Sequence, residues 1–542
     1  MNDHVGRASW TRREFLIATA GLAAGACAGG GRGAPAPAPA AAKNAAAANF
    51  PQFDHLVVLM MENRTFDNML GYLYKSGQAP RGQRFDGVDG KNLFNLAYDG
   101  TKVPVSRGTV MDAPDPDPGE EYPHINTDLF GTVLPAGNQF KAVTDMQAPF
   151  NAPPAPLPYP APMDGFVKDY FNKFTWYTGQ NPTPEQYSQI MKCFGPESVP
   201  VISALAQGFA VADHWHCEVP SQTFCNRSFF HAATSSGFTS NEPYTQFPFH
   251  NVAPTVFNRL DDKGLPWRIY FDTKDLIPLT ALIHFQPLLP KLTTNVKRME
   301  DFYADVKSGS LPAYSFIEPR MILDHNDEHP PAPLFDHIVL PSNVLAGEQL
   351  IATVYNAIKS SNSPTGNNWR NTALLITFDE GGGCYDHVSP GPAPTPDVGQ
   401  RPGEEGFMFD RLGVRVPAVL VSAYTASGTV VDAPLRHTAV ARTMHEKWGI
   451  DYLTQRDKEA PDLAPFFNLT KPRSPASWPT VASRPLSDTS EDPRQPLNEL
   501  QLAIIGAMDA AFPPSGTAAN VKTIGDAQAF LSAKAAHVPA TS

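Results

Sequence analysis

Two stretches of this chain decide its fold: HLVVLMM-ENR at 55–64 and ALLITF-DE at 373–380. Each is an apolar run of strand length that ends directly in a carboxylate, Glu62 in the first and Asp379 in the second. In open parallel α/β sheets, ligands bind outside the carboxyl ends of the strands. The two motifs can therefore converge on one oxygen-rich metal site, although either carboxylate alone would more often be a polar strand end.

The rest of the chain alternates between apolar runs of strand length and helical patterns. Further strands are expected at 267–271, 313–317 and 418–422, and helices at 65–74, 199–207, 347–360 and 438–448. This alternation predicts an α/β fold, with a central, mainly parallel sheet and helices on both faces. The segment 98–162 is rich in Pro, Asp and Gly and shows little periodicity, so we expect loops that form the rim of a site.

The composition excludes one class of partner. A formal net charge of -12 over 542 residues argues against a protein that binds nucleic acid through its backbone. The same charge does not favour an anionic membrane surface. A lipid substrate would have to be reached through apolar or zwitterionic contacts, in a transient encounter with the membrane surface.

The first fifty residues indicate export. Arg12-Arg13 precedes a short apolar run at 17–26, an arrangement typical of a twin-arginine signal peptide over 1–27, and the run is too short for a transmembrane anchor. An Ala/Pro/Gly linker follows at 28–50. We expect a periplasmic or secreted protein. Cys27 follows Ala24-Gly25-Ala26, a weak match to a lipoprotein site, so we favour simple cleavage over lipid anchoring.

The remainder divides into one large domain at 51–470 and a C-terminal extension at 471–542 that contains one amphipathic helix, expected at 497–511. Four cysteines follow the signal peptide, an even number that permits three full disulfide pairings in an oxidising compartment. None has zinc-type spacing. They are Cys193, Cys217, Cys225 and Cys384.

A hydroxyl stands before a predicted helix in VPSQTFCNR, residues 219–227. Free backbone N–H groups and the helix dipole favour an anion such as phosphate at that position. Thr223 is therefore a candidate nucleophile, with an ordinary helix N-cap as the alternative. Ser221 offers a competing hydroxyl two residues earlier.

Several histidines lie in polar, loop-like surroundings and could donate to a phosphoryl oxygen or protonate a leaving alkoxide. Taken singly, each is more often structural or exposed. They are His124, His284, His329 and His387.

Taken in order, the motifs at 62–68, 223–227, 317–319, 326–330 and 379–388 resemble those of the phosphoesterase family. That family contains bacterial phosphatidylcholine-type phospholipases C, plant non-specific phospholipases C and acid phosphatases. The resemblance covers about 51–467 and implies an alkaline-phosphatase-like α/β fold with one active-site metal.

The resemblance also implies roles for individual residues. Metal ligands would be Glu62, Asn63, Asp379 and Glu380. Thr223 would be the nucleophile and a further ligand. His124, His284 and His329 would bind the phosphoryl group or serve the leaving group, with His329 the best candidate for protonating the leaving alcohol. Such a set of hard oxygen donors favours Ca²⁺, Mg²⁺ or Mn²⁺, with zinc left open.

The sequence departs from the family pattern at three places. Gly381 stands where many members have a histidine after the acidic pair, and Cys225 stands where proline often precedes Asn-Arg. An insertion at 331–340 contains His337. The aromatic residues at 166–177 could form a choline-binding lip or belong to the core, and we favour the core.

The resulting expectation is a secreted, metal-dependent phosphoesterase of phospholipase C type that works through a covalent phospho-threonine. One alternative is an acid phosphatase acting on phosphomonoesters. A second is a non-catalytic secreted binding protein, although the intact acidic motifs speak against it.

Overall fold

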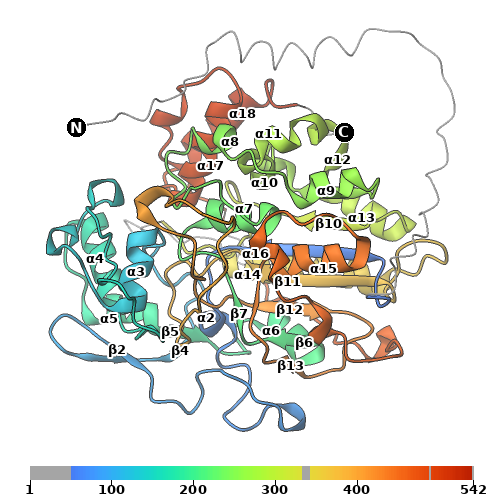
Figure 1. The fold of residues 1–542 in the computed structure, drawn as a ribbon, viewed down its shortest axis with the longest axis horizontal. Helices are drawn as coiled ribbons and strands as arrows, with labels where there is room; N and C mark the ends of the chain where they lie inside the picture. Colours follow the sequence, from blue (N-terminus) through green and yellow to red (C-terminus); the bar gives the residue numbers. More distant parts are fainter. Residues whose placement is uncertain (1–49, 333–341, 487–489, 540–542) are drawn as a thin grey trace. The chain divides into compact units, whose positions relative to one another are not determined.

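The computed structural model describes residues 50–332, 342–486 and 490–539 (Figure 1). The expected signal peptide at 1–27, Cys27, nearly all of the linker and His337 lie outside these ranges. The described residues belong to one compact unit.

The central sheet has eight strands, and all but one run parallel in the described part of the chain. Only β12 is antiparallel to its neighbours, β11 and β6. The α/β class with a mainly parallel sheet is thus confirmed. From one edge to the other the order is β13 (Thr429–Val431), β6 (Ala210–Ala212), β12 (Ala418–Val421), β11 (Thr372–Phe378), β1 (His55–Met61), β10 (Tyr314–Ile317), β8 (Trp267–Phe271) and β9 (Val296–Arg298).

Strands β1 and β11 lie side by side at the centre of the sheet. Their register pairs His55 with Thr372 and Met61 with Phe378, so the two strands end at the same level. Every residue of β11 is buried. Glu62 and Asp379, the next residues along each strand, therefore leave the sheet together.

Helices cover both faces of the sheet (Figure 1). On one face lie α7 (Thr223–Ala232) and α15 (Ala439–Trp448), and on the other lie α6 (Pro200–Gly208) and α14 (Asn343–Ser360). The predictions for 199–207, 347–360 and 438–448 are confirmed to within a few residues. The first predicted helix is shorter, as α2 (Phe66–Leu70), because Gly71 caps it.

The segment 98–162 contains a helix that was not predicted, α3 (Tyr122–Phe130). All nine of its residues are buried, polar ones included, so it shows no apolar stripe that periodicity could detect. The aromatic segment forms α4 (Phe166–Thr178), whose Phe166, Tyr170 and Phe174 are core residues, as favoured. Trp176 is 39% exposed.

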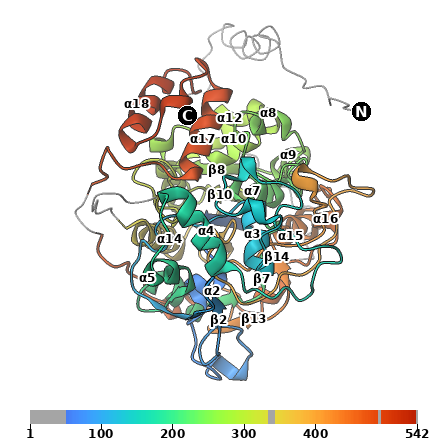
Figure 2. The ribbon, with the colours of Figure 1, turned by 90° about the vertical axis from the view of Figure 1, so that its left-hand side faces the viewer.

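The C-terminal extension packs into the main core. Helix α17 (Glu499–Ala511) lies beside α10 (Leu279–Ile283), as Figures 1 and 2 show, and buries Leu500 and Ile504. A second helix, α18 (Ile524–Lys534), was not predicted because it contains few large apolar residues. The expectation of a single helix was therefore wrong.

Two further findings concern the whole described chain. Cys193, Cys217, Cys225 and Cys384 are all buried free thiols, so none of the possible disulfides is formed. Among the described residues, no helix has the length and apolar character needed to cross a bilayer.

Candidate active site

The two acidic motifs meet directly beyond the ends of β1 and β11. The backbone N–H of Asn63, whose φ is +57°, donates to Asp379 Oδ1 at 3.2 Å. The N–H of Glu380 donates to the same oxygen at 2.7 Å. Within the described structure, Asp379 Oδ2 has no hydrogen-bond partner. The convergence predicted from the sequence is therefore present, with one carboxylate oxygen that accepts no hydrogen bond within the described residues.

Thr223 lies against the first motif. Its hydroxyl is 3.1 Å from Glu62 Oε2 and 3.4 Å from Asn63 Oδ1. The N-cap of α7 is Gln222, so the alternative of Thr223 as an ordinary cap is not supported. Ser221 turns away and donates its hydroxyl to the carbonyl of Thr239. Of the two competing hydroxyls, only Thr223 is seen in contact with the acidic residues.

Arg227, one helical turn after Thr223, forms ion pairs with the carboxylates of the site. Its Nε donates to Glu62 Oε1 at 2.7 Å and lies 3.7 Å from Asp379 Oδ2. Its Nη1 is 3.6 Å from Glu318 at the end of β10. Burial raises the pKa of Glu62 well above its usual value; Arg227 opposes this effect and Asp379 adds to it. The sequence motifs include Arg227 and Glu318, but no role was predicted for either.

Glu120 reaches the site where His124 was expected. Its carboxylate accepts hydrogen bonds from Asn63 Nδ2 and, at 3.1 Å, from Gln222 Nε2. His124 instead lies on α3 with Nδ1 2.8 Å from Asp169 Oδ1, and no contact with Thr223 or the acidic pair is seen. Burial and the neighbouring Glu121 raise the pKa of Glu120 to about 8. Its only sequence signal was an acidic residue in a Pro/Gly loop before a helix.

His329 is the one predicted histidine that joins the group. Its Nδ1 lies 2.7 Å from the Pro330 carbonyl, which fixes the proton there, so Nε2 accepts from Asn63 Nδ2 at 2.9 Å. Burial lowers the pKa of His329 to about 4, and the imidazole is therefore neutral. The side chain of Asn498, the N-cap of α17, lies 3.2 Å from Nδ1.

His284 is placed elsewhere. It is fully buried between α10 and α11 (Phe285–Leu288), with its ring 5.8 Å from that of His231. Burial lowers its pKa to about 3. No contact with Glu62 or Asp379 is seen, because the apolar neighbours Ile283 and Phe285 carry this segment into the core.

Three glycines let the loops close over the acidic pair. A Cβ on Gly382, whose φ is +57°, would lie 2.4 Å from the Asn63 carbonyl oxygen. A Cβ on Gly383 would lie 2.4 Å from the Gly119 carbonyl oxygen, and one on Gly381 would lie 2.4 Å from Val414. The backbone after Asp379-Glu380 thus packs directly on the loops that carry Asn63 and Glu120. At Gly381 a side chain would meet the side chains of Val414 and Thr65.

The donor set fits a divalent cation. Glu62, Asn63 and Thr223 offer oxygen atoms close together, and Asp379 lies beside Asn63. Asp379 Oδ2 and Glu380 Oε1 have no hydrogen-bond partner within the described residues. Burial, with the nearby Glu120 and Asp379, raises the pKa of Glu380 well above its usual value. Crowded, buried carboxylates with free oxygens are stabilised by a bound cation. Hard oxygen ligands suit Ca²⁺, Mg²⁺ or Mn²⁺.

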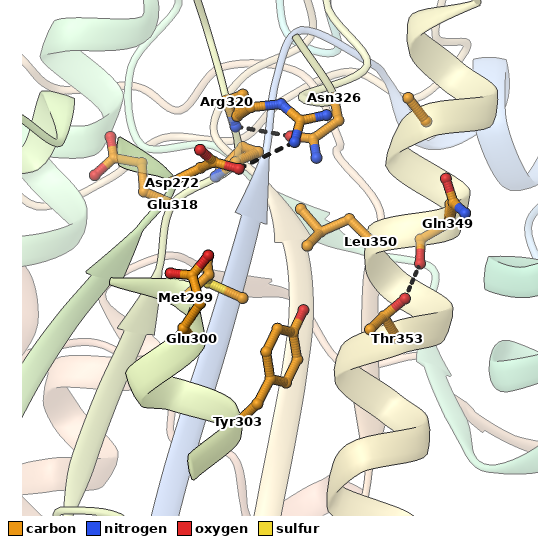
Figure 3. Close-up of a pocket in the computed structure, with 12 residues that line it drawn as sticks. Asp272, Met299, Glu300, Tyr303, Glu318, Arg320, Asn326, Gln349, Leu350 and Thr353 are labelled. Carbon is orange, nitrogen blue, oxygen red and sulfur yellow. Dashed lines mark hydrogen bonds and ion pairs between the residues drawn. The ribbon is translucent and has the colours of Figure 1, made fainter. Parts of the chain in front are cut away.

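A separate cavity of about 230 Å³ lies beside the end of β10 (Figure 3). Arg320 lines this cavity. Its guanidinium donates to Asp272 at 3.0 Å, and its backbone N–H donates to the side chain of Asn326 at 2.7 Å. Glu318 contributes to its wall, but Thr223 and Asp379 do not. This cavity is distinct from the candidate active site.

Comparison with known proteins identifies the family. The sequence pattern of the phosphoesterase family matches residues 53–451. The chain belongs to the phosphoesterase family. Non-specific phospholipase C1 of Arabidopsis thaliana is 32% identical over 478 residues, covering 83% of this chain and 78% of the plant protein. Phospholipase C A of Mycobacterium tuberculosis is 25% identical over 510 residues, covering 85% of both chains. This phosphoesterase is accordingly a hydrolase acting on phosphoester bonds.

Solved structures add little. A protein in the alkaline phosphatase superfamily from Vibrio parahaemolyticus aligns with a TM-score of 0.30 and 12% identity, over 48% of this chain and 64% of that one. A likeness this slight does not assign the fold.

Proposed function

We propose that this phosphoesterase is a phospholipase C-type enzyme that cleaves a phospholipid at its phosphodiester, with Thr223 as nucleophile. The observation that carries the proposal is the Thr223 hydroxyl, 3.1 Å from Glu62 at the start of α7. The names of the plant and mycobacterial relatives support the substrate class.

One divalent cation would be held by the oxygens of Glu62, Asn63, Thr223, Asp379 and Glu380. When bound, it would lower the pKa of the Thr223 hydroxyl and offset charge on the phosphoryl oxygens. Ca²⁺, Mg²⁺ and Mn²⁺ are the ions that these donors suit.

The side chains around Thr223 are arranged for attack on phosphorus. Glu62 Oε2 accepts the hydrogen bond of the hydroxyl and is placed to take its proton as the Oγ–phosphorus bond forms. The bond from phosphorus to the diacylglycerol oxygen breaks, and that oxygen takes a proton from water. A second water then displaces Thr223 and releases the phosphomonoester. The N-terminus of α7 faces the charge that develops on phosphorus.

The expected role of His329 as proton donor to the leaving alcohol stays a prediction. Its neutral ring, with Nε2 accepting a hydrogen bond, makes it a better acceptor or ligand than a donor in this state.

The proposal is tested on purified protein with phosphatidylcholine, a soluble phosphodiester and a phosphomonoester, each with and without chelator. We expect turnover of the two diesters, lost on chelation and restored by metal. Turnover of the monoester alone would establish the acid phosphatase alternative instead. A protein inactive on all three after metal is returned would be the non-catalytic binding protein.

Substitution of the nucleophile gives the first prediction. Thr223→Ala should lower kcat by about 10³-fold or more, because no other hydroxyl is seen beside Glu62. Ser221→Ala is the matched control and should keep activity within about tenfold, since the Ser221 hydroxyl donates to the Thr239 carbonyl and not to an acidic residue. Kinetics on phosphatidylcholine distinguish the two, and equal losses would remove Thr223 from its assigned role.

We also propose export by the twin-arginine route. The support is the Arg12-Arg13 pair before an apolar run, in residues outside the described structure. Replacing both arginines by lysine should retain the protein in the cytoplasm, as fractionation and immunoblotting would show. Unchanged export would contradict the proposal.

A further inference from the structure

A second group of ligand-type side chains lies beside the Thr223 site. Asp117, Glu120 and His329 have their ligand atoms within 4.8 Å of one another, and all three are buried. Asp117 Oδ1 is 3.9 Å from His329 Nδ1, and Glu120 Oε2 is 3.9 Å from His329 Nε2. Two loops that are distant in sequence, one with Asp117 and Glu120 and the other with His329, thus bring two carboxylates and an imidazole together.

Asp117 points to a missing partner. Its side chain is 0% exposed, and neither carboxylate oxygen has a hydrogen-bond partner in the described structure. The nearby Lys173 is engaged by Glu499 at 2.9 Å and by Glu121 at 3.6 Å. A buried carboxylate without hydrogen bonds or a cation is strongly destabilising. A positive ion held by this group would remove that cost.

The charge of the whole site leads to the same conclusion. Of its five carboxylates, Glu62 and Asp379 pair with the guanidinium of Arg227, which also lies 3.6 Å from Glu318. When all five are ionised, as ligands of a cation would be, one divalent cation leaves the group clearly negative, although an anionic phosphate ester has to enter it. A second divalent cation brings it close to neutrality. The five are Glu62, Asp117, Glu120, Asp379 and Glu380.

His329 is prepared to act as a ligand. Its Nδ1–H donates to the Pro330 carbonyl at 2.7 Å, a contact that orients the ring and leaves the lone pair of Nε2 available. Within the described residues, the hydrogen bond to Nε2 comes from the side-chain amide of Asn63 at 2.9 Å, and an amide can rotate aside. The oxygen of that same amide lies 3.4 Å from Thr223. Asn63 therefore connects the two sites.

We propose that Asp117, Glu120 and His329 bind a second divalent cation beside the one assigned to the Thr223 site. An imidazole with two carboxylates suits Mn²⁺ or Zn²⁺ better than Ca²⁺ or Mg²⁺. Its role rests on the proposed function: a second ion would offset charge on the oxygen that leaves phosphorus. His329 would then serve as a ligand in place of a proton donor.

The test counts bound metal and needs no substrate. Metal-free protein, prepared with chelator, is dialysed against Mn²⁺ and in parallel against Ca²⁺, and bound metal is measured by mass spectrometry. The wild type should bind two equivalents of Mn²⁺ and one of Ca²⁺. Asp117→Asn and Glu120→Gln should each bind one equivalent of Mn²⁺.

Asp128→Asn is the matched control, because Asp128 on α3 is also buried with an unpartnered oxygen yet lies outside the group. It should still bind two equivalents of Mn²⁺. Thermal melts in chelator establish that each variant is folded, and Asp117→Asn should melt no lower than the wild type. One equivalent of Mn²⁺ on the wild type, or two on Asp117→Asn, would overturn the proposal. The metal count holds whether or not phosphatidylcholine is hydrolysed, so the two proposals can fail separately.

Discussion

Two buried polar clusters are built from the same two sequence motifs, yet they differ in charge balance. The first residues of each motif, Glu62-Asn63 and Asp379-Glu380, form the Thr223 site. The last residues, Asp67 in one and Asp386-His387 in the other, form a network around Arg415. Within each motif, the residues that join one cluster lie only four to eight positions from the residues that join the other.

In the Arg415 network every carboxylate is paired. Arg415 donates to Asp67 at 2.8 Å and to Asp386 at 2.9 Å, and His387 lies 2.6 Å from Asp67. In the Thr223 site, Asp379 Oδ2 and Glu380 Oε1 have no hydrogen-bond partner within the described chain, and the nearest cation to Asp379 Oδ2 is Arg227 Nε at 3.7 Å, beyond hydrogen-bond distance. The balanced cluster ties loops together, whereas the unbalanced one is where we propose that a cation and a substrate bind.

One substitution in each cluster tests most directly whether the Thr223 site serves activity and the Arg415 network serves stability. Asp379→Asn keeps the acceptor Oδ1 for two backbone N–H groups but removes the charge, and should lower kcat/KM by about 10³-fold with no loss of stability in chelator. Asp386→Asn leaves Arg415 partly unpaired and should cost about 3 kcal/mol of unfolding free energy.

Kinetics and urea unfolding of both variants measure these effects. Activity per folded molecule of Asp386→Asn should stay within about tenfold of the wild type. The comparison would be wrong if Asp379→Asn lost several kcal/mol of stability while Asp386→Asn lost none.

Metal removal should also distinguish the two clusters, through a smaller change in the free energy of unfolding. A cation present at a hundred times its dissociation constant adds about 2.7 kcal/mol to the free energy of unfolding. Chelator should therefore lower the melting temperature of the wild type and of Asp386→Asn alike. It should have much less effect on Asp379→Asn. An equal shift in all three would place the cation outside the Thr223 site.

The smallest expected effect is the contribution of His387, in the balanced network, to the pH dependence of stability. Burial lowers the pKa of His387, but Asp67 and Asp86 more than offset this and raise it to about 9. A raised histidine pKa means that its stabilisation is complete below the unfolded value near 6.5 and is lost as pH rises through about 9.

Urea unfolding at pH 6.5 and 9.5 measures this term, which we expect to be on the order of 1 kcal/mol after allowance for solvent screening. His387→Gln should remove most of the difference between the two pH values. A difference of the same size in His387→Gln would show that other groups cause it.

The sequence predicted those parts of the site that directly follow strands. Glu62 and Asp379 could be placed because β1 and β11 are continuous apolar runs, and parallel strands end at a common edge. Thr223 could be proposed as the nucleophile, but Ser221 could not be ruled out from the sequence. The two hydroxyls differ in the direction in which their side chains point at the start of α7, and the sequence does not encode that direction locally. The strands and most helices were predicted for the same reason, because their periodicity is local.

The sequence did not show that Glu120, and not His124, would reach the site. Both belong to one loop-to-helix stretch, and the contact that selects Glu120 is the packing of Gly119 on Gly383, far away in sequence. Helix α17 was predicted, but the contact of its Asn498 with His329 depends on how the extension docks. Such placements follow from tertiary packing and leave no periodic signal.

The glycines at 381–383 have a further consequence for dynamics. Because Gly382 and Gly383 pack on the backbone of Asn63 and Gly119, the spacing between the loops that carry the proposed ligands is set before any ion arrives. The site is therefore preorganised, and metal entry should cost little conformational entropy. The N–H of Gly382, bonded to Glu380 Oε2 at 2.6 Å, should exchange slowly with solvent deuterium in both the metal-free and the metal-loaded protein.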